Sequence, residues 1–180
     1  MGHVALLAGA DGEGLSKRLG SLSIGALRQD GIESVTIASL LARIGTADPV
    51  VPQRQLAAVI DSFDLGKLGR ATAKFDSSEL AKLNSQIVQE LDFADVETRL
   101  ADSGVTGDAQ FWLAVRGNLA TVDEARVWWD ICTQPLTPVI DAPTVTKAAA
   151  ALLPVGDLNS ATWSSWTKSV SYTHLRAHET

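Results

Sequence analysis

The sequence predicts a mainly α-helical protein, and three features carry that prediction. Apolar residues recur at three- and four-residue spacings, which place them along one face of a helix. Residues that commonly cap helices stand immediately before several of these periodic stretches. Only the N-terminus carries a short, nearly continuous apolar run of the kind that forms a buried strand. The 180 residues are 46% hydrophobic and 20% charged, an ordinary globular composition for one domain or slightly more.

The N-terminal apolar run, residues 3–8, predicts a buried strand. No partner strand is evident further along the sequence. Because a buried strand is not stable alone, we expect the sheet to which it belongs to lie outside this chain. Residues 9–20 contain four glycines and predict a mobile loop, since glycine adopts backbone angles that are closed to other residues.

The rest of the chain predicts a series of helices. Asp76 opens a capping-box sequence ahead of a strongly periodic helix. Thr121 and Glu124 form a second such sequence, which predicts a helix with Trp128, Ile131 and Cys132 on its inner side. The other expected helices run over about 37–44 (ended by Gly45), 56–63, 92–103, 108–118, 144–153 and 159–169, with a proline-containing connector at 133–144.

Charge and cysteine content exclude several classes of protein. The net charge is −6 and the isoelectric point is near 5.0, which does not fit a general nucleic-acid binder, so RNA contact would need local basic patches. No apolar run is long enough to span a membrane, and no leader pattern opens the chain, so we expect a soluble, cytoplasmic protein. The single cysteine, Cys132, excludes an internal disulfide and argues against a thiolate metal site. No metal ligands are predicted.

The glycine-rich loop is the one region with a chemical signature. Gly9 and Gly14 have the separation found in a phosphate-binding P-loop, but Leu15 and Ser16 follow where that motif needs Lys and Ser or Thr. The dinucleotide pattern also fails, because Lys17 stands where its third glycine belongs. What remains is a Leu-Ser-Lys-Arg sequence, residues 15–18, just after a strand. An isolated tetrapeptide of this kind is most simply a solvated turn.

Leu15-Ser16-Lys17-Arg18 resembles the KMSKS loop of class I aminoacyl-tRNA synthetases, in the LSKR form of the glutamyl-tRNA synthetases. Phe63-Asp64-Leu65 matches the same family. Residues 75–84 resemble its F-D-x-x-K-L-x-W-L-N segment, with Glu79 in place of the usual lysine and Lys82 in place of the tryptophan. The resemblance spans about residues 2–170 and favours the bacterial glutamyl type.

This resemblance implies a mainly α fold in which a short N-terminal strand and loop are left from a Rossmann-like catalytic domain and helical domains follow. Residues 1–30 would be the end of the catalytic domain with the LSKR loop, 31–120 an α-helical domain, and 121–170 the start of an α-helical anticodon-binding domain. Residues 171–180 hold the only tyrosine and two of the three histidines, and resemble translated adapter DNA. They are expected to be a non-native tail; the alternative is a frayed natural terminus.

The resemblance also implies the chemistry. The parent would be a glutamate–tRNA ligase that uses ATP, accompanied by Mg²⁺, to join glutamate to tRNA through glutamyl-adenylate. Lys17 would be the catalytic residue that faces the phosphates, within an ATP-binding loop of Leu15, Ser16, Lys17 and Arg18. Arg18 has an equal alternative as a salt-bridge partner of Asp11 or Glu13. The chain lacks the HIGH motif, so we expect it to be a monomeric middle segment with no activity of its own.

Two readings from other classes remain. The chain could be a non-catalytic helical RNA-binding module, or a helical scaffold for another protein, although a scaffold would leave the glycine loop unexplained. Four tryptophans, Trp128, Trp129, Trp163 and Trp166, could stack on anticodon bases. Packing in a core or a domain interface is the commoner use of tryptophan at helical spacing.

Overall fold

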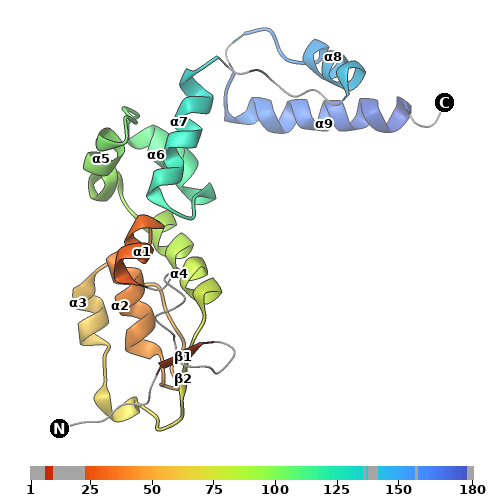
Figure 1. The fold of residues 1–180 in the computed structure, drawn as a ribbon. Helices are drawn as coiled ribbons and strands as arrows, with labels where there is room; N and C mark the ends of the chain where they lie inside the picture. The colour runs from red at the N-terminus through yellow and green to blue at the C-terminus, as the bar shows by residue number, and fades with distance from the viewer. Residues whose placement is uncertain (1–6, 10–22, 136, 138–141, 157, 178–180) are drawn as a thin grey trace. The chain divides into compact units, whose positions relative to one another are not determined.

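The computed structural model describes residues 7–9, 23–135, 137, 142–156 and 158–177; for residue 160 and residues 172–177 it describes the backbone alone. The chain divides into two compact units, Met1–Gln134 and Pro135–Thr180. Both are helical, and the described strands are two short ones in the first unit (Figure 1). The prediction of a mainly α fold is therefore confirmed.

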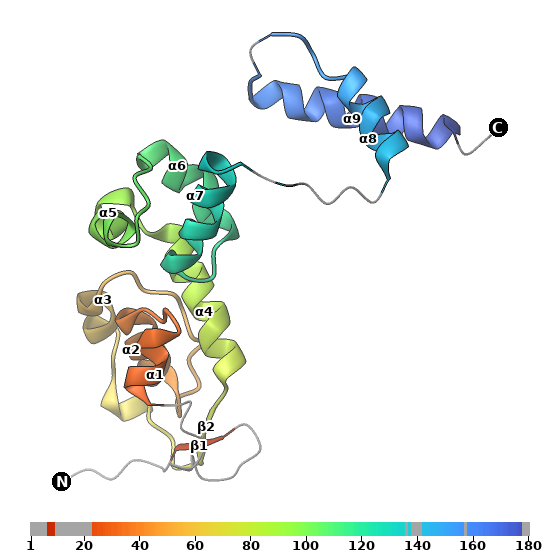
Figure 2. The same ribbon diagram turned by 45° about the horizontal axis from the view of Figure 1, so that its top comes forward.

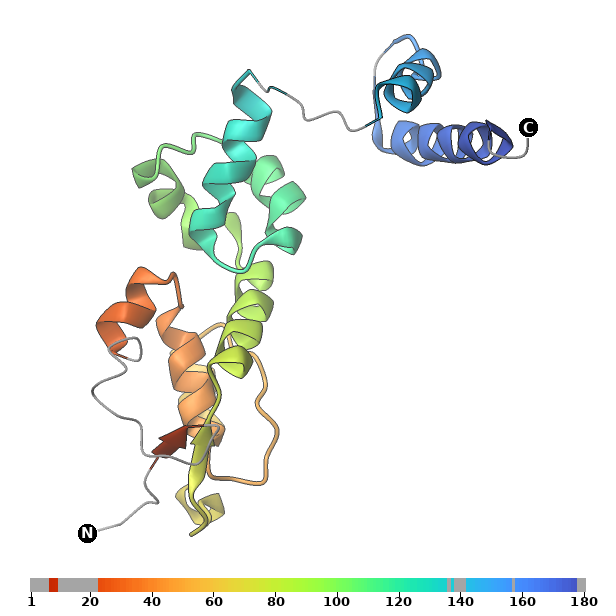
Figure 3. The ribbon, with the colours of Figure 1, turned by 45° about the vertical axis from the view of Figure 1, so that its right-hand side comes forward.

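The two strands of the first unit pair in parallel. Strand β1 (Leu7–Gly9) lies beside β2 (Ala73–Phe75), with Leu7 opposite Ala73 and Gly9 opposite Phe75 (Figure 3). The expectation that β1 has no partner within this chain was wrong. Strand β2 escaped prediction because three residues are too few for an alternation of apolar and polar side chains to identify a strand.

The structure contains a helix in each region of the first unit where the sequence predicts one, and a further helix, α1, that was not predicted. Four are α1 (Ile24–Gln29), α2 (Ser34–Arg43), α3 (Leu56–Asp61) and α4 (Ser77–Glu90), and three more are α5 (Phe93–Asp102), α6 (Ala109–Val115) and α7 (Ala125–Thr133). Short 3-10 turns stand between them: η2 (Leu65–Lys67), η3 (Arg116–Asn118) and η4 (Val122–Glu124).

Predicted capping residues begin three of these helices. The Asp76 side chain accepts a hydrogen bond from the Ser78 backbone N–H at the start of α4. At the start of α6, the Asp108 side chain accepts hydrogen bonds from the backbone N–H groups of Gln110 and Phe111. Asp92 and Asp95 form a reciprocal capping box at α5. Helix α2 ends as predicted, because Gly45 follows it with a φ of +80°, a left-handed conformation that favours glycine.

Two separate groups of buried side chains form the interior of the first unit. We call them the N-terminal core (Leu27, Leu40, Phe75, Leu80, Leu83 and Ile87) and the C-terminal core (Val88, Leu91, Val96, Leu100, Val105, Trp112, Val115, Leu119, Val122 and Ala125). Helix α4 supplies side chains to both. The predicted boundaries after residues 30 and 120 therefore fall inside one compact unit, and the assignment of these regions to catalytic, helical and anticodon-binding domains stays a prediction.

Helix α7 buries a different face from the predicted one. Trp128 and Ile131 are 36% and 45% exposed, and Cys132 is exposed as well. Val122 and Ala125 are buried instead, and Trp129 packs against the C-terminal core. The Thr121 side chain caps no backbone group, and the first turn forms the 3-10 element η4, which changes the direction in which later side chains point.

The second unit contains α8 (Pro143–Ala151) and α9 (Ser160–Ala177). Trp166 donates a hydrogen bond from Nε1 to the Ala149 carbonyl at 2.7 Å, which joins the two helices. None of its described side chains is buried. The predicted end of the last helix near residue 169 was wrong, because the helical backbone continues to Ala177; whether residues 171–180 are native stays a prediction. No described helix combines the length and apolar character needed to cross a membrane.

Candidate functional site

The predicted ATP-binding loop, Leu15, Ser16, Lys17 and Arg18, lies outside the residues that the structure describes. The elements on either side of it are described. Strand β1 ends at Gly9, where the segment that contains Lys17 begins, and Ser23 caps α1 by accepting a hydrogen bond from the Ala26 N–H at 3.0 Å. The predicted site residues thus belong to a connection between a strand and a helix.

The carboxyl end of β1 lies at the same edge as the carboxyl end of β2, because the two strands are parallel. Helix α4 begins at this edge, directly after Phe75. In parallel sheets, ligands bind outside the carboxyl ends of the strands. The segment that contains Lys17 therefore starts at the edge of the strands at which parallel sheets commonly bind ligands.

The first turn of α4 is occupied by its own acidic residues. Asp76 Oδ1 accepts hydrogen bonds from the Ser78 hydroxyl at 2.7 Å and from the Ser78 N–H at 2.8 Å, and these bonds hold the pKa of Asp76 below its ordinary value. Glu79 adds a second acidic side chain to the turn. Since this helix start is already capped by a carboxylate, a phosphate at the sheet edge would depend on cations from the loop.

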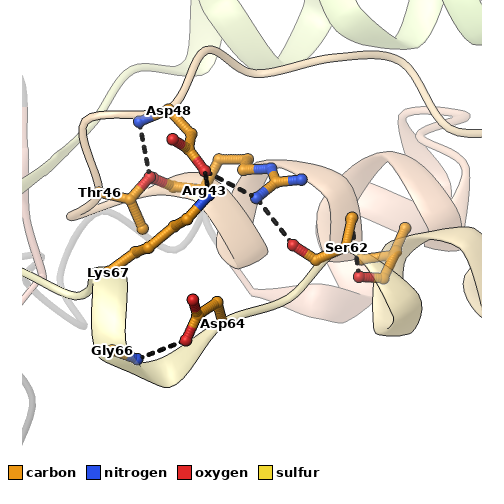
Figure 4. A network of polar contacts seen from close by, with 8 residues as sticks. Arg43, Thr46, Asp48, Ser62, Asp64, Gly66 and Lys67 are labelled. Atoms are coloured by element: carbon orange, nitrogen blue, oxygen red, sulfur yellow. Dashed lines mark hydrogen bonds and ion pairs between the residues drawn. The ribbon is translucent and has the colours of Figure 1, made fainter.

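A polar network at the C-terminal end of α2 connects this helix to the loops around α3 (Figure 4). Asp48 Oδ2 accepts from Lys67 Nζ at 2.8 Å and from Arg43 Nη1 at 3.3 Å, and the bond from Lys67 is the main reason that the pKa of Asp48 is lowered. Arg43 also donates to the Ser62 carbonyl at 3.0 Å. Because both cations are already paired, this network stabilises the loops around α3 and offers no free charge for a ligand.

Asn84 is an important residue that the sequence analysis did not single out. It is 1% exposed on α4, and its Oδ1 accepts from the Glu33 N–H at 2.8 Å and from the Thr36 hydroxyl at 2.9 Å. Its Nδ2 donates to the carbonyls of Gly31 and Ala120, at 3.3 and 2.8 Å. The one available signal was its place as the last residue of the segment 75–84 that resembles the synthetase family.

Exposed cations of the first unit fall into two groups. Arg54, Arg99 and Arg126 form ion pairs with carboxylates within the unit. Arg43 and Lys67 do so as well, with Asp48 (Figure 4). The described lysines and arginines of this unit that form no ion pair are Arg28, Arg70, Lys74 and Lys82. The described ranges contain no group of three or more His, Cys, Asp or Glu side chains placed to hold a metal ion.

The tryptophans divide between packing and exposure. Trp129 contacts Phe111 edge to face, with ring centroids 5.1 Å apart. Trp163 and Trp166 share a face of α9 with centroids 5.5 Å apart, and Trp163 is 67% exposed. Trp129 and Trp166 thus serve packing, whereas Trp128 and Trp163 keep exposed ring surface.

Comparison with known proteins gives a consistent result, although no family model matches the chain. It is 45% identical over 170 residues to glutamate–tRNA ligase 1 of Maricaulis maris and 44% identical over 171 residues to glutamate–tRNA ligase 2 of Methylorubrum populi. Each match covers 94% of this chain and 38% of the relative, so the chain spans about two fifths of their length.

Solved structures agree on the fold. A glutamate–tRNA synthetase from Elizabethkingia anophelis has a TM-score of 0.65 at 16% identity, over 95% of this chain and 41% of that one. A glutamate tRNA ligase from Elizabethkingia meningosepticum, in complex with its amino acid, has a TM-score of 0.69 at 15% identity, over 96% and 42%. These relatives are all enzymes that join an amino acid to tRNA. The chain belongs to the glutamate–tRNA ligase family.

Proposed function

We propose that the whole protein attaches glutamate to tRNA with ATP, and that this chain supplies its ATP-phosphate loop and its helical tRNA-facing region. The observation that carries the proposal is 45% identity to a glutamate–tRNA ligase over 94% of the chain, together with the Leu-Ser-Lys-Arg sequence directly after a parallel strand. The chain spans 38% of that relative, so the activity belongs to a longer protein.

The reaction has two steps. A glutamate carboxylate oxygen attacks the α-phosphorus of ATP, the bond to the bridging oxygen breaks, and pyrophosphate leaves. A hydroxyl at the tRNA terminus then attacks the glutamyl carbonyl, and AMP leaves. In the first step negative charge develops on the departing phosphates, where a positioned ammonium and backbone N–H groups stabilise it.

Lys17 is the proposed source of that ammonium. Leu15, Ser16 and Arg18 complete the loop, with Ser16 helping to set its conformation and Arg18 either contacting ATP or pairing with a nearby carboxylate. The acidic first turn of α4 supports this division of roles, because Asp76 and Glu79 leave the phosphates to be bound by the loop. Mg²⁺ would arrive on the phosphate oxygens of ATP, which are the hard ligands it prefers, and would neutralise part of their charge.

The tRNA partner is proposed to contact those cations in the described part of the first unit that no carboxylate holds: Arg28, Arg70, Lys74 and Lys82. They provide the local positive charge that an acidic protein needs to bind a phosphate backbone. The region after residue 121 is proposed to begin the anticodon-binding part, with Trp163 exposed. We infer that the whole protein acts as a cytoplasmic monomer.

The test replaces the matched segment of the Maricaulis maris ligase with residues 2–170 of this chain and measures single-turnover adenylation at saturating ATP. Lys17→Ala should lower the rate by roughly 10²–10³, the usual effect of removing one charge-stabilising donor, while ATP affinity changes much less. Lys17→Arg should restore the rate only in part, because a planar guanidinium does not reproduce a compact ammonium.

The matched control is Lys168→Ala, which removes an exposed lysine of α9 that forms no ion pair with a described residue. It should leave adenylation unchanged, since Lys168 lies on α9, outside the loop that is proposed to bind the ATP phosphates. A near-normal rate in a folded Lys17→Ala protein would contradict the assigned role of the loop and favour a non-catalytic RNA-binding module. Glutamate-dependent exchange of pyrophosphate into ATP by the isolated chain would contradict its assignment as one part of an enzyme.

A further inference from the structure

The two cores of the first unit share no side chain, although one helix runs through both. Helix α4 contributes Leu80, Leu83 and Ile87 to the N-terminal core and the very next residue, Val88, to the C-terminal core. Figures 1 and 2 show α1, α2 and α3 along the first half of α4, and α5, α6 and α7 around its other end. A unit built in this way has two packed halves and one continuous connection between them.

A small joint connects the halves beside α4. Gly31, between α1 and α2, has a φ of +75°, and a Cβ added there would lie 2.9 Å from Thr121 Cβ, so the two backbones approach closely. Asn84 donates to the carbonyl of Gly31 on one side of the joint and to that of Ala120 on the other. These contacts are partly buried and lie against α4, where a rotation of one half changes distances least.

Open clefts flank this joint on both sides. One, of about 350 Å³, has Arg28 and Glu33 from the first half and Arg99 and Asp123 from the second among its lining residues. The other, of about 420 Å³, lies between Leu27 and Asp30 of the first half and Thr121 of the second, with Leu80 of α4 in its wall. The open space in these two clefts leaves room for small rotations of the halves about the joint.

Ion pairs also bridge the halves. Arg99 on α5 donates to Glu33, the residue that precedes α2, at 2.8 Å. Arg54, before α3, donates to Asp92 at 2.6 Å and to Asp95 at 3.2 Å, at the start of α5. These pairs hold the pKa of Asp92 below its ordinary value and raise that of Arg54. Exposed pairs contribute little individually and are screened by salt.

We infer that the first unit is a hinged pair of modules, residues 23–87 and residues 88–134, which rotate about the joint of Gly31, Asn84 and Thr121. The Glu33–Arg99 and Arg54–Asp92–Asp95 ion pairs hold the closed arrangement. Because these bridges are few, polar and exposed, a moderate change in ionic strength or a bound polyanion is sufficient to release them. The hinge does not depend on the proposed function.

The experiment measures a distance between the modules by double electron–electron resonance in the 180-residue chain. Cys132, the only cysteine, carries one spin label on the exposed side of α7, and Lys74→Cys on β2 carries the other. At low salt the unmodified ion pairs should give one narrow distance distribution. Arg54→Gln with Arg99→Gln should broaden it or shift it by several ångströms, and so should 1 M NaCl on the chain with its ion pairs intact.

Arg126→Gln is the matched control. Arg126 is 47% exposed, close to the 45% of Arg99, and it forms an ion pair with Asp130 inside a single module. It should leave the distribution unchanged. An equally narrow distribution in the double variant and at high salt, with helical circular dichroism retained, would overturn the hinge. If the double variant does not fold, the salt series alone decides, since it requires no substitution in either ion pair.

Discussion

At the scale of single residues, Asn84 does more than any other described side chain to join distant segments. Its amide satisfies groups from the α1–α2 turn, from the start of α2 and from the segment before η4. All of these groups are at least partly buried there, so removal of the amide leaves them with fewer hydrogen-bond partners. Buried polar groups that lose their partners destabilise a fold more than the lost bonds alone suggest.

Asn84→Leu should therefore lower the free energy of unfolding by about 3 kcal/mol, because it leaves the Glu33 N–H and two carbonyls unpaired at nearly constant volume. Urea unfolding followed by circular dichroism measures this. The control, Ser85→Ala, removes a hydroxyl that bonds only within its own helix and should stay within about 0.5 kcal/mol. Equal effects of the two substitutions would contradict the importance of the network.

Gly31 gives a second prediction at this scale. Gly31→Ala combines a φ of +75° with a contact of 2.9 Å to Thr121, so it should destabilise the chain by about 1–3 kcal/mol. Gly117→Ala is the matched control, since an added Cβ there meets nothing within 4 Å and the φ is not positive. Differential scanning calorimetry on both variants decides; a loss at Gly117 as large as that at Gly31 would refute the reasoning.

At the scale of elements, the start of α4 shows how a cap couples stability to pH. The pKa of Asp76 is lowered because the Ser78 hydroxyl and N–H donate to its carboxylate. The ionised carboxylate therefore stabilises the folded state above its ordinary pKa of about 4, and this contribution disappears as the pH falls through the lowered folded value. The loss of this stabilising contribution is therefore expected only at acidic pH.

Asp76→Ala should lower the melting temperature by a few degrees at pH 7, and the difference from the parent chain should shrink as the pH falls below about 4. Asp76→Asn should keep most of the stability at pH 7, because asparagine also caps helices well, but should lack the acid-dependent part. Melting curves between pH 7 and pH 3 measure both. A difference between Asp76→Ala and the parent that grows on acidification would show that the sign is wrong.

Helix α7 shows how one irregular turn decides which side chains are buried. The 3-10 element η4 precedes it, and Trp129 rather than Trp128 packs against the C-terminal core, with its ring edge to face with Phe111. Trp129→Ala should lower the free energy of unfolding by about 2 kcal/mol. Val127→Ala on the same helix, at a residue 61% exposed, should change it by less than about 0.5 kcal/mol. Chemical denaturation compares the two variants, and a larger loss with Val127→Ala than with Trp129→Ala would contradict the packing of Trp129 against the C-terminal core.

At the scale of the whole molecule, the buried side chains lie in the first unit. Both cores draw on residues between Leu27 and Ala125, whereas the described side chains of the second unit are all at least partly exposed. Burial of apolar surface is the main favourable contribution to folding. The two units should therefore differ sharply in stability when they are produced separately.

We expect residues 1–134 to unfold cooperatively when produced alone, and residues 135–180 alone to show no cooperative transition. A third form that ends at residue 170 should melt at the same temperature as the full chain, because the polar, aperiodic sequence of residues 171–180 offers no apolar face to bury. Thermal melts by circular dichroism test all three forms. A cooperative transition in residues 135–180, or a lower melting temperature without residues 171–180, would show that packing there has been underestimated.

Local patterns were sufficient for most helices and insufficient for the sheet and the joint. The periodic residues from Leu80 to Leu91 predicted both the extent and the buried face of α4, because a single helix buries one stripe against its neighbours. The repeat at residues 56–63 predicted a helix correctly, yet Leu56 and Ile60 are 57% and 63% exposed. For the site, the sequence pointed to Lys17 through family resemblance, and the structure contributes the parallel strands from whose edge that segment departs.

The sequence by itself determined the helical class, the helix starts at Asp76, Asp92 and Asp108, and the resemblance to glutamyl-tRNA synthetases, because each of these depends on residues close together in the chain. The tertiary structure alone decided that β1 pairs with β2, that α7 buries Trp129, and that Asn84 joins Gly31 to Ala120. Those outcomes depend on contacts between residues far apart in the chain. Local periodicity carries no information about such partners, since the same short pattern is compatible with many of them.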